Sequence, residues 1–240
     1  MSDYDPRIVD LYDTDNPDGP DHDYFRSLAA RAGARRVLDV GCGTGILTVT
    51  LATGDREVVG LDPSGTMLAF ARNRPGGDTV TWIEGDTRVV PPGPFDLMVM
   101  SGNVAQHIPD AQWTRTLADL HRVAAKGALL AFESRNPAVR AWEQWNQPEW
   151  TSRDTRYGPL RESCAAVEEE GGRVRLRFRN HFVSDGDTVV EEELLTFRSQ
   201  AQITAQLAEA GFEVTAVWGD WNTSPFDGTQ QIMVFEARLM

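Results

Sequence analysis

Three glycines separated by single residues mark the first place in the chain where chemistry could occur. Gly41, Gly43 and Gly45 follow a short apolar run, and Asp39 stands just before them. Glycine lets the backbone turn sharply, adopt positive φ and approach a ligand without a Cβ in the way. A helical pattern over 46–53 follows, and the first N–H groups of a helix lack partners within it. The pattern therefore predicts a turn that binds a small ligand.

Two further carboxylates follow the next two apolar runs. Asp62 ends the run at 57–61, a place where an acid can accept hydrogen bonds from both hydroxyls of a ribose. Alternatively, it is a helix N-terminal carboxylate beside Ser64, favoured by the helix dipole. Asp86 comes after the run at 80–83 and could accept a hydrogen bond from an adenine amino group. Together with the glycine turn, these acids favour a ligand that contains a nucleoside.

The glycine spacing narrows the kind of nucleoside. The dinucleotide fingerprint G-x-G-x-x-G places its third glycine one residue later than this chain does, which disfavours NAD and FAD. A phosphate-binding P-loop needs Lys and Ser or Thr after its last glycine, where this chain has Ile46 and Leu47. A tight strand–helix turn without any ligand is the structural alternative.

These residues require a sheet whose strands end at one common edge. Near-continuous apolar runs alternate with helical patterns, which indicates a parallel sheet covered on both faces. Ligands of such sheets bind outside the carboxyl ends of the strands, where the glycine turn, Asp62, Asp86 and the segment 101–107 all map. The predicted strands are 37–40, 57–61, 80–83, 95–100, 128–132, 212–218 and 231–238. The predicted helices are 7–12, 21–32 with Asp21 as its N-cap, 46–53, 64–73, 110–124 and 200–210.

The alternation breaks at residue 137, and a small antiparallel β insertion is expected, with strands at 164–169, 173–183 and 188–197. Strand alternation places four basic side chains on one face: Arg175, Arg177, Arg179 and His181. This face could bind an acidic substrate, but a solvent-exposed face paired with acids such as Glu168 and 191–193 is the favoured interpretation. Three tryptophans indicate either an aromatic acceptor pocket or simple packing of the insertion: Trp142, Trp145 and Trp150.

Residues 35–134 resemble the class I S-adenosylmethionine-dependent methyltransferases. The resemblance is carried by Val37-Leu38-Asp39-Val40-Gly41-Cys42-Gly43-Thr44-Gly45, Val59-Gly60-Leu61-Asp62-Pro63-Ser64 with Met67, Gly85-Asp86 and Phe95-Asp96-Leu97. It implies an α/β fold with a doubly wound, mostly parallel, seven-stranded Rossmann-like sheet whose last strand is antiparallel. It also implies S-adenosyl-L-methionine as the cofactor, with these binding residues: Tyr12, Asp39, Gly41, Cys42, Gly43, Gly45, Asp62, Pro63, Met67, Gly85, Asp86, Thr87 and Ser101.

The resemblance also implies particular roles. Gly41, Gly43 and Gly45 would pass the methionine part of the cofactor, Asp62 would bind the ribose, and Asp86 would lie near the adenine. The N-terminal segment would fold over the cofactor, so a contact from Tyr12 is expected.

The expected reaction is transfer of a methyl group to a small-molecule acceptor by in-line displacement, which requires alignment in a site that excludes water. His107 is the candidate base; alternatively it bonds the following helix. No metal is expected, because the four histidines show no metal-ligand spacing. Whether N, O or C is methylated stays open. The expected substrate residues are Asn103, His107, Trp142, Trp145, Arg179 and His181.

Two other functions are considered. A non-catalytic protein that binds S-adenosylmethionine or S-adenosylhomocysteine for regulation would share every cofactor residue. A nucleotide-dependent oxidoreductase is disfavoured by the glycine spacing. Acceptors such as DNA or glutamine are disfavoured too, because the sequence Asn/Asp-Pro-Pro-Tyr/Phe is absent after the fourth strand.

Composition excludes several classes of protein. The net charge is −13, and residues 1–25 hold eight Asp against one Arg, which argues against a nucleic-acid partner. This acidic head could be a solvated tail, the favoured interpretation, or could favour a cationic ligand. No apolar run is long enough for a membrane helix, and the acidic start is unlike a signal peptide, so a cytoplasmic location is expected. Two cysteines, Cys42 and Cys164, are too few for a disulfide framework, and Cys42 is assigned a steric role.

We expect one methyltransferase domain over 1–240. It comprises an N-terminal helical cap (1–34), a cofactor-binding core (35–136), a lid or substrate insertion (137–199), and a closing helix and strand pair (200–240). The oligomeric state is not indicated by the sequence.

Overall fold

Seven apolar strands form the centre of the fold in this computed structural model, which describes residues 3–240; residues 1 and 2 of the predicted cap lie outside the described residues. The strand order is β10-β11-β5-β4-β1-β2-β3. Neighbours among β1–β5 pair in parallel, whereas β11 is antiparallel to both β5 and β10. The predicted doubly wound sheet with an antiparallel last strand is therefore confirmed. Its strands are β1 (Arg36–Val40), β2 (Glu57–Asp62), β3 (Thr81–Glu84), β4 (Phe95–Met100), β5 (Ala124–Arg135), β10 (Phe212–Trp218) and β11 (Ile232–Leu239).

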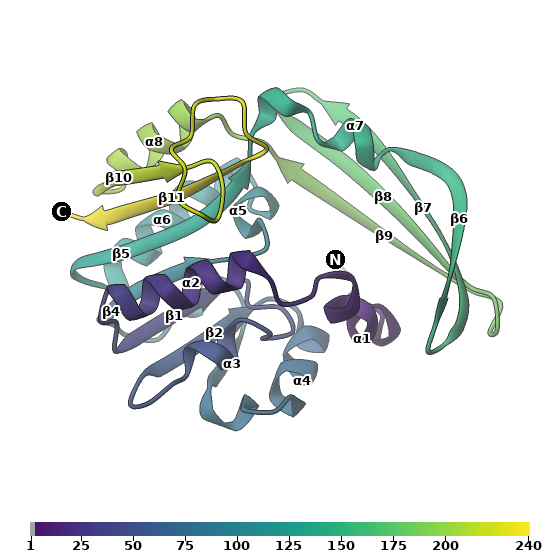
Figure 1. The fold of residues 1–240 in the computed structure, drawn as a ribbon, viewed down its shortest axis with the longest axis horizontal. Helices are drawn as coiled ribbons and strands as arrows, with labels where there is room; N and C mark the ends of the chain where they lie inside the picture. Colours follow the sequence, from purple (N-terminus) through teal and green to yellow (C-terminus); the bar gives the residue numbers. More distant parts are fainter. Residues whose placement is uncertain (1–2) are drawn as a thin grey trace.

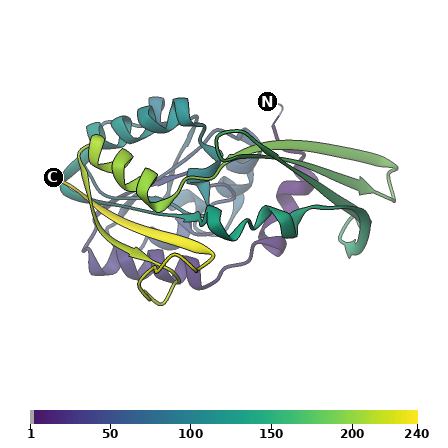
Figure 2. The ribbon, with the colours of Figure 1, turned by 90° about the horizontal axis from the view of Figure 1, so that it is seen from above.

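Helices cover both faces of this sheet (Figures 1 and 2). Helices α2 (Pro20–Arg31) and α3 (Thr48–Leu51) bury Phe25 and Leu51 against one face. Helices α6 (Asp110–Val123) and α8 (Gln200–Glu209) bury Trp113 and Leu207 against the other. Each fully buried large apolar side chain contributes roughly 1.5–3 kcal/mol, so the two layers fix the sheet edge that carries the site. The remaining core elements are α4 (Gly65–Asn73), α5 (Val104–His107), η1 (Gly77–Thr79), η2 (Thr87–Val89) and η3 (Pro137–Val139).

Local signals set most helix ends, with two corrections. Ser64 caps α4 as predicted, accepting a hydrogen bond from the Met67 N–H at 3.0 Å. Helix α2, however, is capped by Gly19 and starts at Pro20, so Asp21 lies in its first turn and is not the N-cap. Helix α3 is much shorter than the predicted 46–53: it starts at Thr48 and ends at Leu51, since the backbone of Ala52 (φ −80°, ψ 68°) is no longer helical.

A second, four-stranded antiparallel sheet lies between β5 and α8 in the sequence, with strand order β6-β7-β8-β9. Its strands, which we call the insertion sheet, are β6 (Gln147–Thr155), β7 (Gly158–Glu169), β8 (Arg173–Phe182) and β9 (Asp187–Thr196), and α7 (Trp142–Trp145) precedes them. Figure 1 shows this sheet extending away from the seven-stranded one. The predicted insertion is confirmed, but β6 was not predicted, because Pro148 and a register shift between Gln147 and Thr151 interrupt its pattern.

Helix α1 (Pro6–Asp15) lies between the two sheets (Figure 1). Its Leu11 packs against Leu160 and Phe182 of the insertion sheet, while its Asp13 contacts Thr44 of the core. The N-terminal segment therefore connects the insertion sheet to the predicted ligand turn. Among the helices of residues 3–240, none combines the length and apolar character needed to cross a membrane.

Candidate active site

Asp62 joins the glycine turn to the end of β2. One carboxylate oxygen accepts the Gly43 N–H at 2.8 Å, and the other accepts the Ser64 N–H at 2.9 Å. The side chain is buried, and this burial raises the carboxyl pKa, although the two backbone N–H donors oppose the rise. Each carboxylate oxygen keeps lone-pair capacity for another donor, such as a ribose hydroxyl.

The three turn glycines serve different purposes. All have positive φ, but a Cβ on Gly41 would stand 2.5 Å from Val104, and one on Gly45 would stand 2.5 Å from Trp82. At Gly43, no atom lies within 4 Å of such a Cβ, so this glycine borders open space. Gly41 and Gly45 are thus required by packing, and Gly43 alone leaves room for a ligand.

Four N–H groups of the glycine turn are bonded within the fold. The N–H groups of Gly41 and Cys42 both donate to the Leu61 carbonyl, and the Gly45 N–H donates to the Cys42 carbonyl. The Gly43 N–H donates to Asp62. These four donors therefore shape the turn and are not offered to a ligand.

The Asp39 carboxyl and the Cys42 thiol are two buried groups next to this turn. Asp39 has no exposed surface, accepts a hydrogen bond from Thr48 Oγ1 at 2.7 Å, and has its pKa raised to about 6 by burial. Burial also raises the pKa of the Cys42 thiol, so the sulfur is held neutral. A neutral, buried thiol fits the steric role predicted for Cys42.

The end of β3 lies beside Asp62, where the adenine was expected. The Gly85 N–H donates to the Asp62 backbone carbonyl at 2.9 Å. The Asp86 carboxylate is bound by Arg88 and Arg115, and the hydrogen bond from Arg88 lowers its pKa. Thr87 is buried and donates to Asp119, so its hydroxyl is used within the fold. The role of Asp86 near an adenine stays a prediction.

The remaining expected cofactor residues are placed along the same edge. Met67 is buried in the first turn of α4, and Pro63 is exposed just before it. Ser101 lies directly after β4 and is half-buried. Tyr12, in α1, is largely buried, and burial raises its pKa, with further contributions from Glu193 and Asp62. The contact of Tyr12 with the cofactor, which the resemblance implied, stays a prediction.

The segment after β4 contains a strained residue held by a buried acid. Asn103 has φ of +61°, in the left-handed region that residues other than glycine rarely adopt. Its N–H donates to Glu133 Oε1 at 2.5 Å. Glu133 is 1% exposed, and burial raises its pKa to about 7. Glu133 was missed from the sequence, although an acid directly after the apolar run 128–132 was a signal.

His107 ends α5 and faces the insertion sheet. Its Nδ1 lies 3.8 Å from Glu193 Oε2, and its side chain is 43% exposed. Tyr4, also missed from the sequence, is largely buried, and burial followed by Glu193 and Asp62 raises its pKa. The N-terminal segment, α5 and β9 therefore meet above Asp62.

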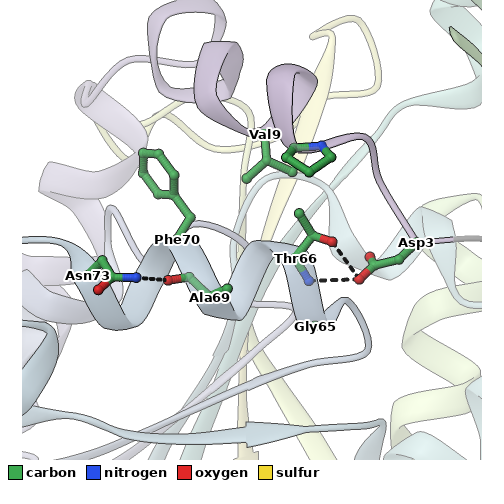
Figure 3. A pocket seen from close by; sticks show the side chains of 8 residues that line it. Asp3, Val9, Gly65, Thr66, Ala69, Phe70 and Asn73 are labelled. Carbon is green, nitrogen blue, oxygen red and sulfur yellow. Dashed lines mark hydrogen bonds between the residues drawn. The ribbon is translucent and has the colours of Figure 1, made fainter.

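The acidic head is not the solvated tail that was favoured. Asp3 accepts hydrogen bonds from Ser64 Oγ at 2.5 Å and from the Thr66 N–H at 2.7 Å, at the start of α4 (Figure 3). Asp13 accepts from Thr44 Oγ1 and pairs with Arg74. A groove of about 560 Å³ between α1 and α4 does not include the glycine turn or Asp62; its lining residues are Asp3, Pro6, Val9, Gly65, Thr66, Ala69, Phe70 and Asn73.

The insertion sheet carries a cavity of about 310 Å³, and Trp145 is one of the residues that line it. Trp142 instead packs against Phe197, with ring centroids 4.5 Å apart. Arg179 and His181 alternate with the cavity-lining Phe178 and Asn180 and so lie on the opposite face. The structure does not bring these two basic residues to the cavity, whose lining is Trp145, Gln147, Thr151, Glu162, Ser163, Cys164, Phe178 and Asn180.

The basic face of β8 is paired mainly as the favoured interpretation predicted. Arg175 binds Glu169 and Arg177 binds Glu192, both at exposed positions. The correction concerns Glu168, Glu191 and Glu193, for which the described part of the chain shows no pairing with these arginines. Glu168 binds Arg140. The side chains of Glu191 and Glu193 lie on the other face, opposite Phe178 and Leu176.

Comparison with known proteins gives consistent matches. The family described as "Methyltransferase domain" matches residues 37–127. A glycine N-methyltransferase from Oryctolagus cuniculus is 30% identical over 151 residues, covering 54% of this chain and 51% of that protein. The chain thus spans about half the length of this relative.

Solved structures share the whole fold. A S-adenosylmethionine-dependent methyltransferase from Clostridium acetobutylicum superimposes with a TM-score of 0.81 at 15% identity, covering 97% of this chain and 98% of that one. An amino pentose methyltransferase from Micromonospora echinaspora, solved with S-adenosylmethionine, gives a TM-score of 0.69 at 23% identity over the full length of both chains.

Proposed function

Because the chain belongs to the class I S-adenosylmethionine-dependent methyltransferase family, we propose that it transfers a methyl group from S-adenosylmethionine to a small-molecule acceptor by in-line displacement. The observation that carries the proposal is the position of Asp62. It binds the glycine turn and the start of α4 at once, and its oxygens keep capacity for ribose hydroxyls.

The residues present fit this cofactor. Gly43 borders open space, Asp62 is buried beside it, and Tyr12 lies close by. When bound, S-adenosylmethionine supplies a methyl group on a cationic sulfur that leaves as a neutral thioether. The acids around Tyr12 favour binding of a cation, but since the charge disappears during transfer, they assist binding more than the chemical step.

Residues of the chain would supply alignment and exclude water. Helix α1 lies over the glycine turn and contacts the insertion sheet, so both segments shield the edge that holds Asp62. His107, between Glu193 and Asp62, is the proposed base for an acceptor that must lose a proton. Asn103 and Trp145 are proposed to contact the acceptor. Arg179 and His181 receive no role, because they lie on the opposite face of β8.

Calorimetry with S-adenosylmethionine tests the cofactor site. The intact protein is expected to bind in the micromolar range or tighter, and Asp62→Ala is expected to weaken binding strongly. Absence of heat with the intact protein would overturn the proposal. A mass-spectrometric screen of candidate acceptors for a gain of one methyl group then tests the reaction.

Cofactor binding without any methyl gain across a broad panel would support the regulatory binder in place of the enzyme. A cytoplasmic location stays a prediction.

A further inference from the structure

The face of the insertion sheet that meets the core is acidic. Register pairs Glu191 with Phe178 and Glu193 with Leu176, so both acids share the face of these apolar residues. Phe182 and Leu160, on the same face, pack against Leu11 of α1, and Glu193 faces His107 of α5, which defines this as the inner face. The exposed Glu192 points the other way, where it pairs with Arg177.

These inner-face acids lack a strong cationic partner within residues 3–240. Glu191 Oε2 accepts a hydrogen bond from Asn180 Nδ2 at 3.3 Å, whereas its Oε1 is buried without a donor. The nearest basic group to Glu193 is His107, at 3.8 Å. A buried carboxylate without a charged partner costs free energy, so this arrangement favours a ligand that brings positive charge.

Glu133, in the core, is a second carboxyl with an oxygen that lacks a hydrogen-bond partner. Glu133 is 1% exposed, and its Oε2 has no partner among the described residues. Its carboxyl holds the loop at Asn103, whose own Oδ1 is also buried without a donor. Glu133 binds Asn103 at the start of α5, and His107 at the end of the same short helix lies 3.8 Å from Glu193, so the two acids flank α5. The unsatisfied atoms of Glu133, Asn103 and Glu191 are oxygens, and a ligand with N–H donors would satisfy them. Trp142 Nε1, in the cluster around Leu176, is a buried donor without a partner among the described residues.

The cavity beside Glu191 is suited to a compact organic group. Asn180, which donates to Glu191, is 8% exposed and lines the cavity of about 310 Å³. Trp145 and Phe178 supply aromatic walls. The Arg135 guanidinium already lies 4.9 Å from the centre of the Trp145 ring, so Phe178 is the wall at which an ammonium would be favoured over a neutral group. An anionic acceptor would be repelled by Glu191 and Glu193.

We infer that the methyl acceptor is an amine whose ammonium is bound by Glu191 and Glu193 while its body occupies this cavity. The inference rests on the proposed methyl transfer. For transfer, the ammonium gives up one proton, its lone pair forms the new N–C bond, and the C–S bonding electrons leave with the sulfur. One proton is released in each turnover, and His107, next to Glu193, is placed to take it.

The test compares benzylamine with benzyl alcohol, which differ mainly in charge, as ligands for the protein loaded with S-adenosylhomocysteine. Calorimetry at pH 7 is expected to show at least ten-fold tighter binding of the amine. Glu191→Gln is expected to remove most of this preference, whereas the matched control Glu192→Gln, one residue away on the outer face, leaves it unchanged.

Equal binding of the two probes, binding of neither, or an unchanged preference in Glu191→Gln would overturn the inference. These outcomes are separate from failure of the proposed function, which would appear as loss of S-adenosylhomocysteine binding before any probe is added. In the acceptor screen, methyl gain on amines with an increased KM in Glu191→Gln supports the inference. Methyl gain on hydroxyl compounds alone counts against it.

Discussion

Asp13 of α1 accepts a hydrogen bond from Thr44 Oγ1 of the glycine turn at 2.5 Å. The same carboxylate pairs with Arg74 after α4, and both partners are mostly buried. Hydrogen bonds to charged groups contribute roughly 1.5–3 kcal/mol. The N-terminal helix is therefore an integral part of the site.

Asp13→Asn is expected to weaken S-adenosylmethionine binding by about ten-fold, on the order of 1.4 kcal/mol, because α1 is held less firmly over the turn. Calorimetry measures the change. Asp15→Asn is the control, since Asp15 lies in the same helix but pairs with Arg153 of the insertion sheet. Equal affinity of the Asp13 variant and the unmodified protein would contradict the prediction.

Substitutions at two of the turn glycines are expected to have different effects, one mainly on ligand binding and the other mainly on stability. Gly43→Ala incurs roughly 1–2 kcal/mol of backbone strain but no steric overlap, so it mainly narrows the ligand space. Gly41→Ala adds a clash with Val104 and is expected to lower the unfolding free energy further. Urea denaturation and calorimetry give the two quantities. Val104→Ala in the Gly41→Ala background is expected to restore part of the stability; no recovery would argue against the clash.

His107→Ala is expected to lower turnover at least ten-fold with little change in cofactor affinity, because general bases typically contribute 10²–10⁴-fold. His181→Ala is the matched control. Its ring bonds Thr188 on the outer face of the insertion sheet, so turnover is expected to stay unchanged. If the two variants lose activity equally, or neither does, His107 is not the base.

Glu133 predicts a pH dependence of stability. Its folded-state pKa of about 7 lies above the ordinary 4.5, so the folded protein binds the proton more tightly. The stability that protonated Glu133 contributes to folding is fully present below about pH 4.5. It falls as pH rises and is lost above about pH 7. The total is on the order of 3 kcal/mol.

Glu133→Gln keeps an acceptor for the Asn103 N–H but cannot ionise, so it is expected to flatten the fall in unfolding free energy between pH 5 and pH 8. Urea denaturation at several pH values measures it. Glu213→Gln, at an exposed position of β10, is the control. Parallel profiles for Glu133→Gln and the unmodified protein would refute the assignment.

Sequence reasoning recovered the core because its signals are local. The glycine turn follows β1, Asp62 ends β2 and Ser64 caps α4, each a matter of a few adjacent residues. The seven-stranded order then follows from alternation and from the family resemblance.

The part of the site that would bind the acceptor was harder to predict from the sequence, because it depends on contacts between residues far apart in the chain. Composition made the acidic head look like a tail, yet Asp3 and Asp13 have partners far along the sequence. In the sequence, 191–193 were treated as one group of acids, whereas the register separates Glu191 and Glu193 from Glu192. The packing of Phe182 against Leu11 of α1 shows which face is the inner one. No sequence pattern marks Tyr4, and only the folded structure places it near the site.

The anchoring of α1 at both ends bears on how long a spent cofactor stays bound. Asp3 holds the start of α4, Asp13 holds the glycine turn, and Leu11 packs against the insertion sheet. Exchange of the thioether product for fresh cofactor is then expected to require these contacts to break together. Helix α1 also joins the insertion sheet through the exposed ion pairs Arg7–Asp185 and Asp10–Arg156. Added salt weakens these pairs, so it is expected to shorten the residence time of the product and to relieve product inhibition.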